Sequence, residues 1–213
     1  MKLHAIVPVK ALALAKSRLA PVLAPAERRR LVLDMFERVL ATLGRACVSA
    51  VWVVSADPEL LALAAARRAN PIAERGGGLN AALEQARRAA EASGAQALVV
   101  VPADVPLLTP ADIGALLALL RGGADVVLAP DEAGRGTNAL ALRARAELPF
   151  SFGEGSAERH LRLAAERGLI VRRHHSPTLA LDVDDPPSLA RYRALTMPEP
   201  APPARPALGN SCP

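Results

Sequence analysis

Apolar residues follow two different patterns along the chain, and each pattern predicts one kind of element. Short uninterrupted apolar runs occupy 5–9, 50–55 and 97–101, as expected of strands that are buried on both faces. Between such runs, apolar residues recur every three or four positions, which predicts amphipathic helices. The clearest helix follows Pro25 and has apolar positions at Leu31, Val32, Met35, Phe36, Val39, Leu40 and Leu43.

The same alternation continues to residue 195. Further helices are predicted from Asp57, a plausible N-cap, through Arg68, and at 79–93, 109–120, 156–167 and 186–195. Further strands are predicted at 125–129, 138–142, 169–173 and 179–183. This order favours an α/β fold of three layers, in which helices cover both faces of a mostly parallel central sheet.

The composition fits a single domain followed by a tail. The chain has 213 residues and is 51% apolar, which is enough to build one hydrophobic core. Residues 1–196 carry the whole alternating pattern. From 197 to 213 the sequence is rich in proline and has no periodicity, so we expect this tail to be disordered.

The cysteines and the N-terminal residues indicate a cytoplasmic protein. Cys47 and Cys212 are too few for a disulfide framework or a zinc knuckle. Residues 1–20 lack the apolar stretch and cleavage site of an export signal. No uncharged run is long enough to cross a bilayer, so we expect no membrane association.

The charge of the chain favours small anionic substrates over nucleic acid. The formal net charge is +5, but aromatic side chains, on which bases stack, make up only 2% of the residues. The arginines are scattered rather than clustered. We therefore expect no nucleic-acid partner and a small phosphorylated ligand instead.

An aspartate follows the strand predicted at 97–101, at the edge where ligands bind in open α/β sheets. Asp104 lies between Pro102 and Pro106, in a loop that would hold its carboxylate rigidly. This carboxylate is a candidate metal ligand. The alternative is that Asp104 only caps a turn beside a proline.

A second acidic pair follows the strand predicted at 179–183. Strand side chains alternate, so the carboxylates of Asp182 and Asp184 would point the same way. Magnesium prefers oxygen ligands from one or two carboxylates and from substrate phosphates, so Asp104 and this pair are predicted to share a magnesium site. Alternatively, Asp184 or Asp185 caps the next helix, for which Asp182 comes too early.

Cations and glycines follow other predicted strands. Lys10, Lys16 and Arg18 come after the first strand, where they could surround a triphosphate or form a solvated basic loop. Three glycines at 76–78 run into a helix whose free N–H groups could approach a base or a phosphate. A flexible surface loop is the alternative for this segment.

Two later loops, 136–140 and 152–156, contain hydroxyls and backbone donors that suit an anionic acceptor. The same residue types also serve ordinary turns and helix N-caps. His160 is expected to be a surface or packing residue rather than a base. His174 and His175 lack partners at metal spacing, so no zinc site is expected.

An ordered set of motifs links the chain to one known family. The motifs are IVPVK (6–10), AKSRL (15–19), GLN (78–80), PADVPLL (102–108), GTNAL (136–140), FGEGS (152–156) and LDVD (181–184). Together they resemble the 2-phospholactate and phosphoenolpyruvate guanylyltransferases of deazaflavin coenzyme F420 biosynthesis. The resemblance covers residues 3–195.

This resemblance implies a nucleotidyltransferase fold of the nucleotide-diphospho-sugar transferase type, GTP as donor, magnesium as cofactor and release of pyrophosphate. It also implies roles for individual residues. Magnesium would be held by Asp104, Asp182 and Asp184, the triphosphate would be steadied by Lys10, Lys16 and Arg18, the guanine would lie near Gly78 and Asn80, and the phosphorylated acid would be received by Thr137, Gly153 and Ser156.

Two other functions remain as alternatives. A metal-dependent glycosyltransferase also uses an aspartate pair, but here the pair at 182–184 comes near the end of the domain and Asp104 occupies the middle. A non-catalytic nucleotide-binding regulator would not need three aspartates and two loop lysines. The acceptor could be phosphoenolpyruvate, 2-phospho-L-lactate or 3-phospho-D-glycerate, and the composition favours phosphoenolpyruvate. A homodimer is compatible with the pattern, which does not require one.

Overall fold

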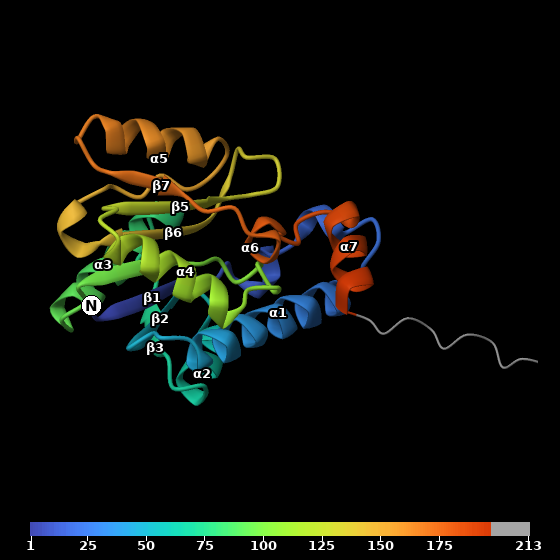
Figure 1. Ribbon diagram of the computed structural model, residues 1–213. Helices are drawn as coiled ribbons and strands as arrows, with labels where there is room; N and C mark the ends of the chain where they lie inside the picture. Colours follow the sequence, from blue (N-terminus) through green and yellow to red (C-terminus); the bar gives the residue numbers. More distant parts are fainter. Residues whose placement is uncertain (197–213) are drawn as a thin grey trace, which may run out of the picture.

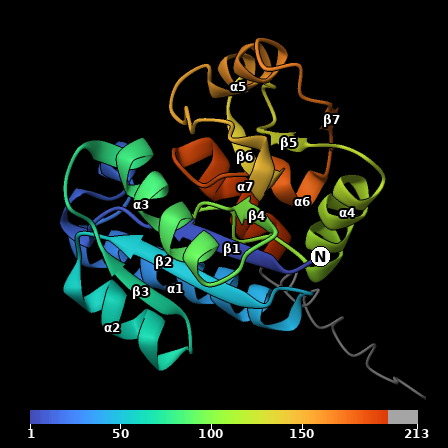
Figure 2. The same cartoon turned by 90° about the vertical axis from the view of Figure 1, so that its left-hand side faces the viewer.

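A mixed sheet of seven strands runs through the centre of the protein, and the computed structural model describes residues 1–196 around it (Figures 1 and 2). The strands are β1 (Leu3–Pro8), β2 (Ala50–Ser55), β3 (Asn70–Ala73), β4 (Ala97–Val100), β5 (Val126–Pro130), β6 (Thr137–Arg143) and β7 (Val171–Arg173). They lie in the order β3-β2-β1-β4-β6-β5-β7. Only β6 is antiparallel to its neighbours, so the prediction of a mostly parallel sheet is confirmed. The tail predicted at 197–213 lies outside the described residues.

Helices cover both faces of this sheet. They are α1 (Pro25–Arg45), α2 (Pro58–Ala66), α3 (Gly78–Ala92), α4 (Pro110–Arg121), α5 (Ser156–Ala165), α6 (Pro177–Ala180) and α7 (Pro186–Thr196). One apolar core joins the sheet to α1, α2 and α4, and a second joins it to α3 and α5. The three-layer prediction is therefore confirmed. Among the described residues, no helix is both long and apolar enough to cross a membrane.

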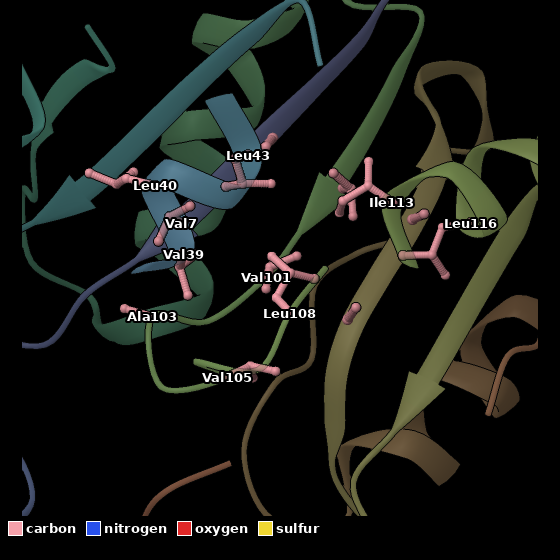
Figure 3. Close-up of a cluster of buried hydrophobic side chains, with 14 of the residues drawn as sticks. Val7, Val39, Leu40, Leu43, Val101, Ala103, Val105, Leu108, Ile113 and Leu116 are labelled. Atoms are coloured by element: carbon pink, nitrogen blue, oxygen red, sulfur yellow. The ribbon is translucent and has the colours of Figure 1, made fainter. Parts of the chain in front are cut away.

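Successive side chains along the central strands point to opposite faces of the sheet, so each strand contributes to both cores. In β1, Val7 faces α1 and α4, whereas the preceding Ile6 faces α3. Figure 3 shows Val7 and Val101 beside Val39 and Leu43 of α1 and near Ile113 of α4. Because both faces are covered, the central strands are apolar at nearly every position, with His4 and Ser55 as buried exceptions, and each buried Val, Leu or Ile contributes about 1.5–3 kcal/mol.

A third, smaller core fixes the C-terminal helix α7, which lies beside α1 and away from the strands (Figure 1). Leu19, from a short 3-10 turn at Ser17–Leu19, packs there with Met35 of α1. Val183, Leu189 and Tyr192 bring the final segment and α7 to the same place. This packing puts the neighbours of Leu19 and Val183, which include Lys16 and Asp184, at one edge of the sheet.

The prediction of a strand at 179–183 was wrong. Pro177 opens the short helix α6, because the fixed φ of proline suits the first helical position. Within residues 1–196, the segment after α6 pairs with no strand. The carbonyl of Ala180, the last residue of α6, accepts from Asn138 Nδ2 at 3.1 Å, and the N–H of Val183 donates to the Asp104 carbonyl at 3.0 Å.

One strand, β3, was not predicted. It is only four residues long, lies at the edge of the sheet, and contains Pro71. Proline cannot donate to a strand ladder, and an edge strand is the place where this loss is tolerated. The helices, by contrast, begin close to the predicted residues: Asp57 caps α2 by accepting from Glu59 N, and Thr109 caps α4 by accepting from Asp112 N.

Candidate functional site

A cavity of about 780 Å³ opens at the carboxyl ends of the central strands. Its volume lies within the range of small-molecule sites. Segments that follow β1, β3 and β4 form much of its wall. Of the residues predicted from the sequence, the wall contains Lys10, Lys16, Arg18, Gly78, Asp104 and Asp184.

Lys16 joins two of the predicted aspartates. Its ammonium nitrogen lies 2.8 Å from Asp104 Oδ2 and 2.6 Å from Asp184 Oδ1, and its side chain is 7% exposed. Burial alone would lower the pKa of Lys16, but the negative charges and hydrogen bonds of Asp104 and Asp184 outweigh it and raise the pKa. Lys16 is therefore a buried ammonium that holds two loops together.

Asp182 adds a third carboxylate to this cluster. Asn138 Nδ2 donates to its Oδ1 at 3.2 Å. Burial raises the pKa of Asp182, and the negative charge of Asp104, then of Asp184, raises it further against the opposing hydrogen bond from Asn138. The structure thus places the three aspartates named from the sequence near one another, although Asp182 and Asp184 lie on an irregular segment instead of a strand.

The cluster carries an excess of negative charge. The cluster contains one ammonium, Lys16, and three carboxylates, and the pKa of Asp182 is raised first by burial and then by the negative charges of Asp104 and Asp184. Within residues 1–196 no three His, Cys, Asp or Glu side chains are already arranged as a metal-binding group, and Lys16 lies where a cation between Asp104 and Asp184 would lie. The oxygen donors and their uncompensated charge fit a hard divalent cation, once the lysine side chain moves aside.

Asp185 has the capping role that the sequence left open. Its Oδ1 accepts from Ser188 N at 2.9 Å at the start of α7. Hydrogen bonds from Ser188 lower the pKa of Asp185. Because Asp185 caps the helix, the carboxylate of Asp184 remains available to Lys16 and to the cavity.

Two further cations line the cavity without a protein counter-ion. Lys10 and Arg18 are exposed, and neither lies within 4.0 Å of a carboxylate among the described residues. Both follow β1, as predicted. Unpaired cations beside a cavity are available to an anionic ligand.

Of the two residues predicted to lie near the guanine, Gly78 lines the cavity and Asn80 supports a loop of its wall. Gly78 is part of the wall at the start of α3. Asn80 uses both polar atoms of its side chain on Phe152, accepting from its N–H at 2.8 Å and donating to its carbonyl at 3.2 Å. Asn80 thus fixes the loop at 152–156 against α3, and Phe152 itself lines the cavity.

The predicted acceptor residues form a network beside the cavity. Ser156 Oγ donates to Thr137 Oγ1 at 3.1 Å, and both side chains are buried. Gly153 adopts a φ of +115°, which only glycine takes easily. None of these three residues is part of the cavity wall, although Phe152 beside Gly153 is.

His160 completes this network. The N–H of Ser151 donates to His160 Nε2 at 3.0 Å, so the neutral ring carries its proton on Nδ1 and donates it to Thr137 Oγ1, 3.1 Å away. The expectation of a packing residue is confirmed, because His160 is buried and its ring packs edge-on against Phe152. Nothing in the local sequence indicated that His160 bonds to Thr137.

The pKa of His160 predicts acid sensitivity. Burial, aided by the charge of Arg159, lowers it from 6.5 to about 4. Between these values the unfolded chain binds more protons than the native protein, so the free energy of unfolding should fall as the pH drops from about 6.5 to about 4. The expected loss from this residue is up to about 3 kcal/mol.

Urea unfolding of the wild type and of His160→Gln at several pH values between 4.5 and 7.5 measures this effect. The variant should lose part of the acid dependence, while His4, also buried with a lowered pKa, contributes equally to both proteins. An identical pH slope in the two proteins would show that His160 is not the group responsible.

The mostly parallel sheet, the glycine-led helix and the charged cavity fit a transferase of the nucleotidyltransferase class, to which the guanylyltransferase relatives assign the chain. Among solved structures, a putative nucleotide-diphospho-sugar transferase from Desulfovibrio desulfuricans has this fold, with a TM-score of 0.77 and 18% identity over 92% of this chain and 89% of that one. The chain belongs to the guanylyl transferase CofC-like family, whose pattern matches residues 3–192. The resemblance stated from the motifs is thereby confirmed.

Two relatives illustrate the range of this family. A phosphoenolpyruvate guanylyltransferase of Rubrobacter xylanophilus is 48% identical over 194 residues, which cover 91% of this chain and 95% of the relative. A 3-phospho-D-glycerate guanylyltransferase of Phenylobacterium zucineum is 43% identical over 178 residues, 81% of each chain. The family is thus the same for both, while the named acceptors differ.

Proposed function

We propose that this protein transfers GMP from GTP to phosphoenolpyruvate, or to the closely related 2-phospho-L-lactate or 3-phospho-D-glycerate, with release of pyrophosphate, as a step of coenzyme F420 biosynthesis. The observation that carries the proposal is the buried Lys16 ammonium between Asp104 and Asp184, at the cavity of a guanylyl transferase family member. Phosphoenolpyruvate is preferred because the more similar of the two relatives bears that name. The proposed location is the cytoplasm.

The reaction joins two anions, so charge dominates its requirements. An oxygen of the acceptor phosphate attacks the α-phosphorus of GTP in line, the bond to the β-phosphate breaks, and pyrophosphate leaves with the electron pair. No nucleophile from the protein is needed. Holding the two phosphates in line supplies much of the rate enhancement, because a bimolecular encounter becomes effectively unimolecular.

The chain's own cations would stabilise the charge that develops on the leaving group. Lys10 and Arg18 line the cavity and form no ion pair among residues 1–196, and Lys16, which is bound to Asp104 and Asp184, lines it too. Preorganised cations of this kind act where charge develops in the transition state. The network of Thr137, Ser156 and His160 would orient the phosphorylated acid through the loop at 152–156.

Asp104, Asp182 and Asp184 are the residues that would hold magnesium. When bound, Mg²⁺ would neutralise phosphate charge and orient the reacting groups. Lys16 would then exchange its carboxylate partners for the phosphates of GTP. This exchange would account for the cationic side chain among the carboxylates.

Pyrophosphate release from GTP in the presence of magnesium tests the proposal. Each of the three acids is offered separately, and the active combination is repeated with ATP and CTP. Release with GTP and one acid is the expected result and identifies the acceptor. If no pyrophosphate is released with any of the three acids, the proposed reaction is contradicted, and a glycosyltransferase or a regulatory nucleotide binder becomes the better hypothesis.

A further inference from the structure

One carboxylate of the cavity wall has no partner among residues 1–196. Of the wall's three acidic residues, Asp104 and Asp184 bind Lys16, whereas Glu74 accepts no hydrogen bond and forms no ion pair from its side chain among the described residues. Glu74 follows β3, and its N–H donates to the Ser55 carbonyl at 2.9 Å, which fixes its backbone at the sheet edge. A half-buried acceptor that faces a cavity and lacks a donor is suited to a ligand that supplies donors.

The position of Glu74 separates it from the phosphate end of the cavity. Lys10 follows β1 and Glu74 follows β3, and β2 lies between these strands. Two strand spacings amount to about 10 Å. A ribose and a base span a distance of this order, so a nucleotide with its phosphates near Lys10 and Lys16 would bring its base to Glu74.

Two exposed apolar side chains line the same cavity as Glu74. Leu14 is 63% exposed and Leu79 is 44% exposed, and both are part of the wall that contains Glu74. Large exposed apolar residues that share one cavity mark a binding surface for an apolar or planar group. The glycines at 76–78 all have positive φ, and a Cβ on Gly77 would lie 2.9 Å from Ala81 Cβ. Glycine is therefore required for the chain to turn from Glu74 into α3.

We propose that Glu74 recognises the guanine base, by accepting hydrogen bonds from its N1–H and its exocyclic N2 amino group. An ionised carboxylate has two acceptor oxygens and no donor. On its Watson–Crick edge, guanine presents two adjacent donors, the N1–H and the N2 amino group. Adenine and cytosine each have one donor group with an acceptor beside it on that edge, and uracil has one donor between two acceptors. A lone carboxylate therefore selects guanine. This inference rests on the proposed function, since it assumes that the cavity takes a nucleoside triphosphate.

The Glu74→Gln variant separates base recognition from other roles. A glutamine amide still accepts from N1–H, but its NH₂ group meets the N2 amino group of guanine, donor against donor. ITP lacks the N2 amino group, and XTP has a carbonyl there that can accept from the amide. Measured as kcat/KM with the active acid, the variant should lose about 10- to 100-fold toward GTP, lose much less toward ITP, and gain toward XTP.

Glu166→Gln, at an exposed glutamate after α5, is the matched control and should keep the wild-type preference for GTP over ITP. An equal loss toward GTP, ITP and XTP in Glu74→Gln would overturn the inference, because it would indicate a ribose contact or a structural role. Calorimetric binding of GTP and ITP without any acid is measured in parallel. If the wild type binds GTP more tightly than ITP, Glu74→Gln loses this preference and neither protein shows turnover, the proposed reaction fails while the base recognition stands. Equal binding of GTP and ITP by the wild type, or an unchanged preference in Glu74→Gln, refutes the recognition itself.

Discussion

The Asp104→Asn variant should lose at least about a hundredfold in kcat, the usual loss when one electrostatic contributor to a transition state is removed. Asp104 is the carboxylate that connects the cluster: it pairs with Lys16 and its charge raises the pKa of Asp182. Asparagine keeps the shape but removes the negative charge that a divalent cation needs. Pyrophosphate release at saturating GTP and acid measures the loss.

The same variant should remain folded. Asparagine can still accept from Lys16, and the backbone carbonyl of residue 104 still accepts from Val183 N. Removing one charge also relieves the repulsion felt by Asp182. Asp34→Asn, at an exposed aspartate on α1, is the matched control and should retain activity. Wild-type turnover in Asp104→Asn would refute the role of this carboxylate in the site.

The sequence predicted the fold well where burial alone determines the pattern of apolar residues. The central strands are buried on both faces, so β1, β2 and β4 appear as uninterrupted apolar runs that need no knowledge of their neighbours. The helices of the two cores show the matching periodicity and strong N-terminal signals such as Asp57 and Thr109. Edge strand β3 lacks both signals, because it is short and contains Pro71.

Parts of the site depend on contacts between distant segments, and these could not be predicted. Lys16 and Asp184 are 168 positions apart, and their ion pair exists because Leu19 and Val183 enter the same small core. The irregular path after α6 depends on Asn138 and on the Asp104 carbonyl, which no local pattern reveals. The strand ends indicated which residues carry the chemistry, and the tertiary packing decides which of them meet.

The Lys16→Met variant should be less active and less stable to unfolding than the wild type, and magnesium should restore part of the lost stability. Methionine keeps an apolar stem but leaves Asp104 and Asp184 facing each other without the ammonium. Breaking a buried ion pair costs about 3–5 kcal/mol, but these carboxylate side chains are 29% and 46% exposed, so solvent screening reduces the expected loss to roughly 1–3 kcal/mol. For a domain of this size, each kcal/mol lowers Tm by about 2–4 °C.

Magnesium should raise the Tm of Lys16→Met more than that of the wild type, because removal of the ammonium leaves the carboxylates with no competing cation. Lys10→Met is the matched control: Lys10 lines the same cavity but has no carboxylate partner among residues 1–196, so its loss should leave the magnesium response of Tm unchanged. Thermal unfolding of the three proteins in EDTA and in magnesium makes the comparison. If Lys16→Met and the wild type respond equally to magnesium, the cation does not compete with Lys16 for these aspartates. The exchange of Lys16 from carboxylates to phosphates would then lose its physical basis, and the lysine would be a purely structural link between the segments that follow β1, β4 and α6.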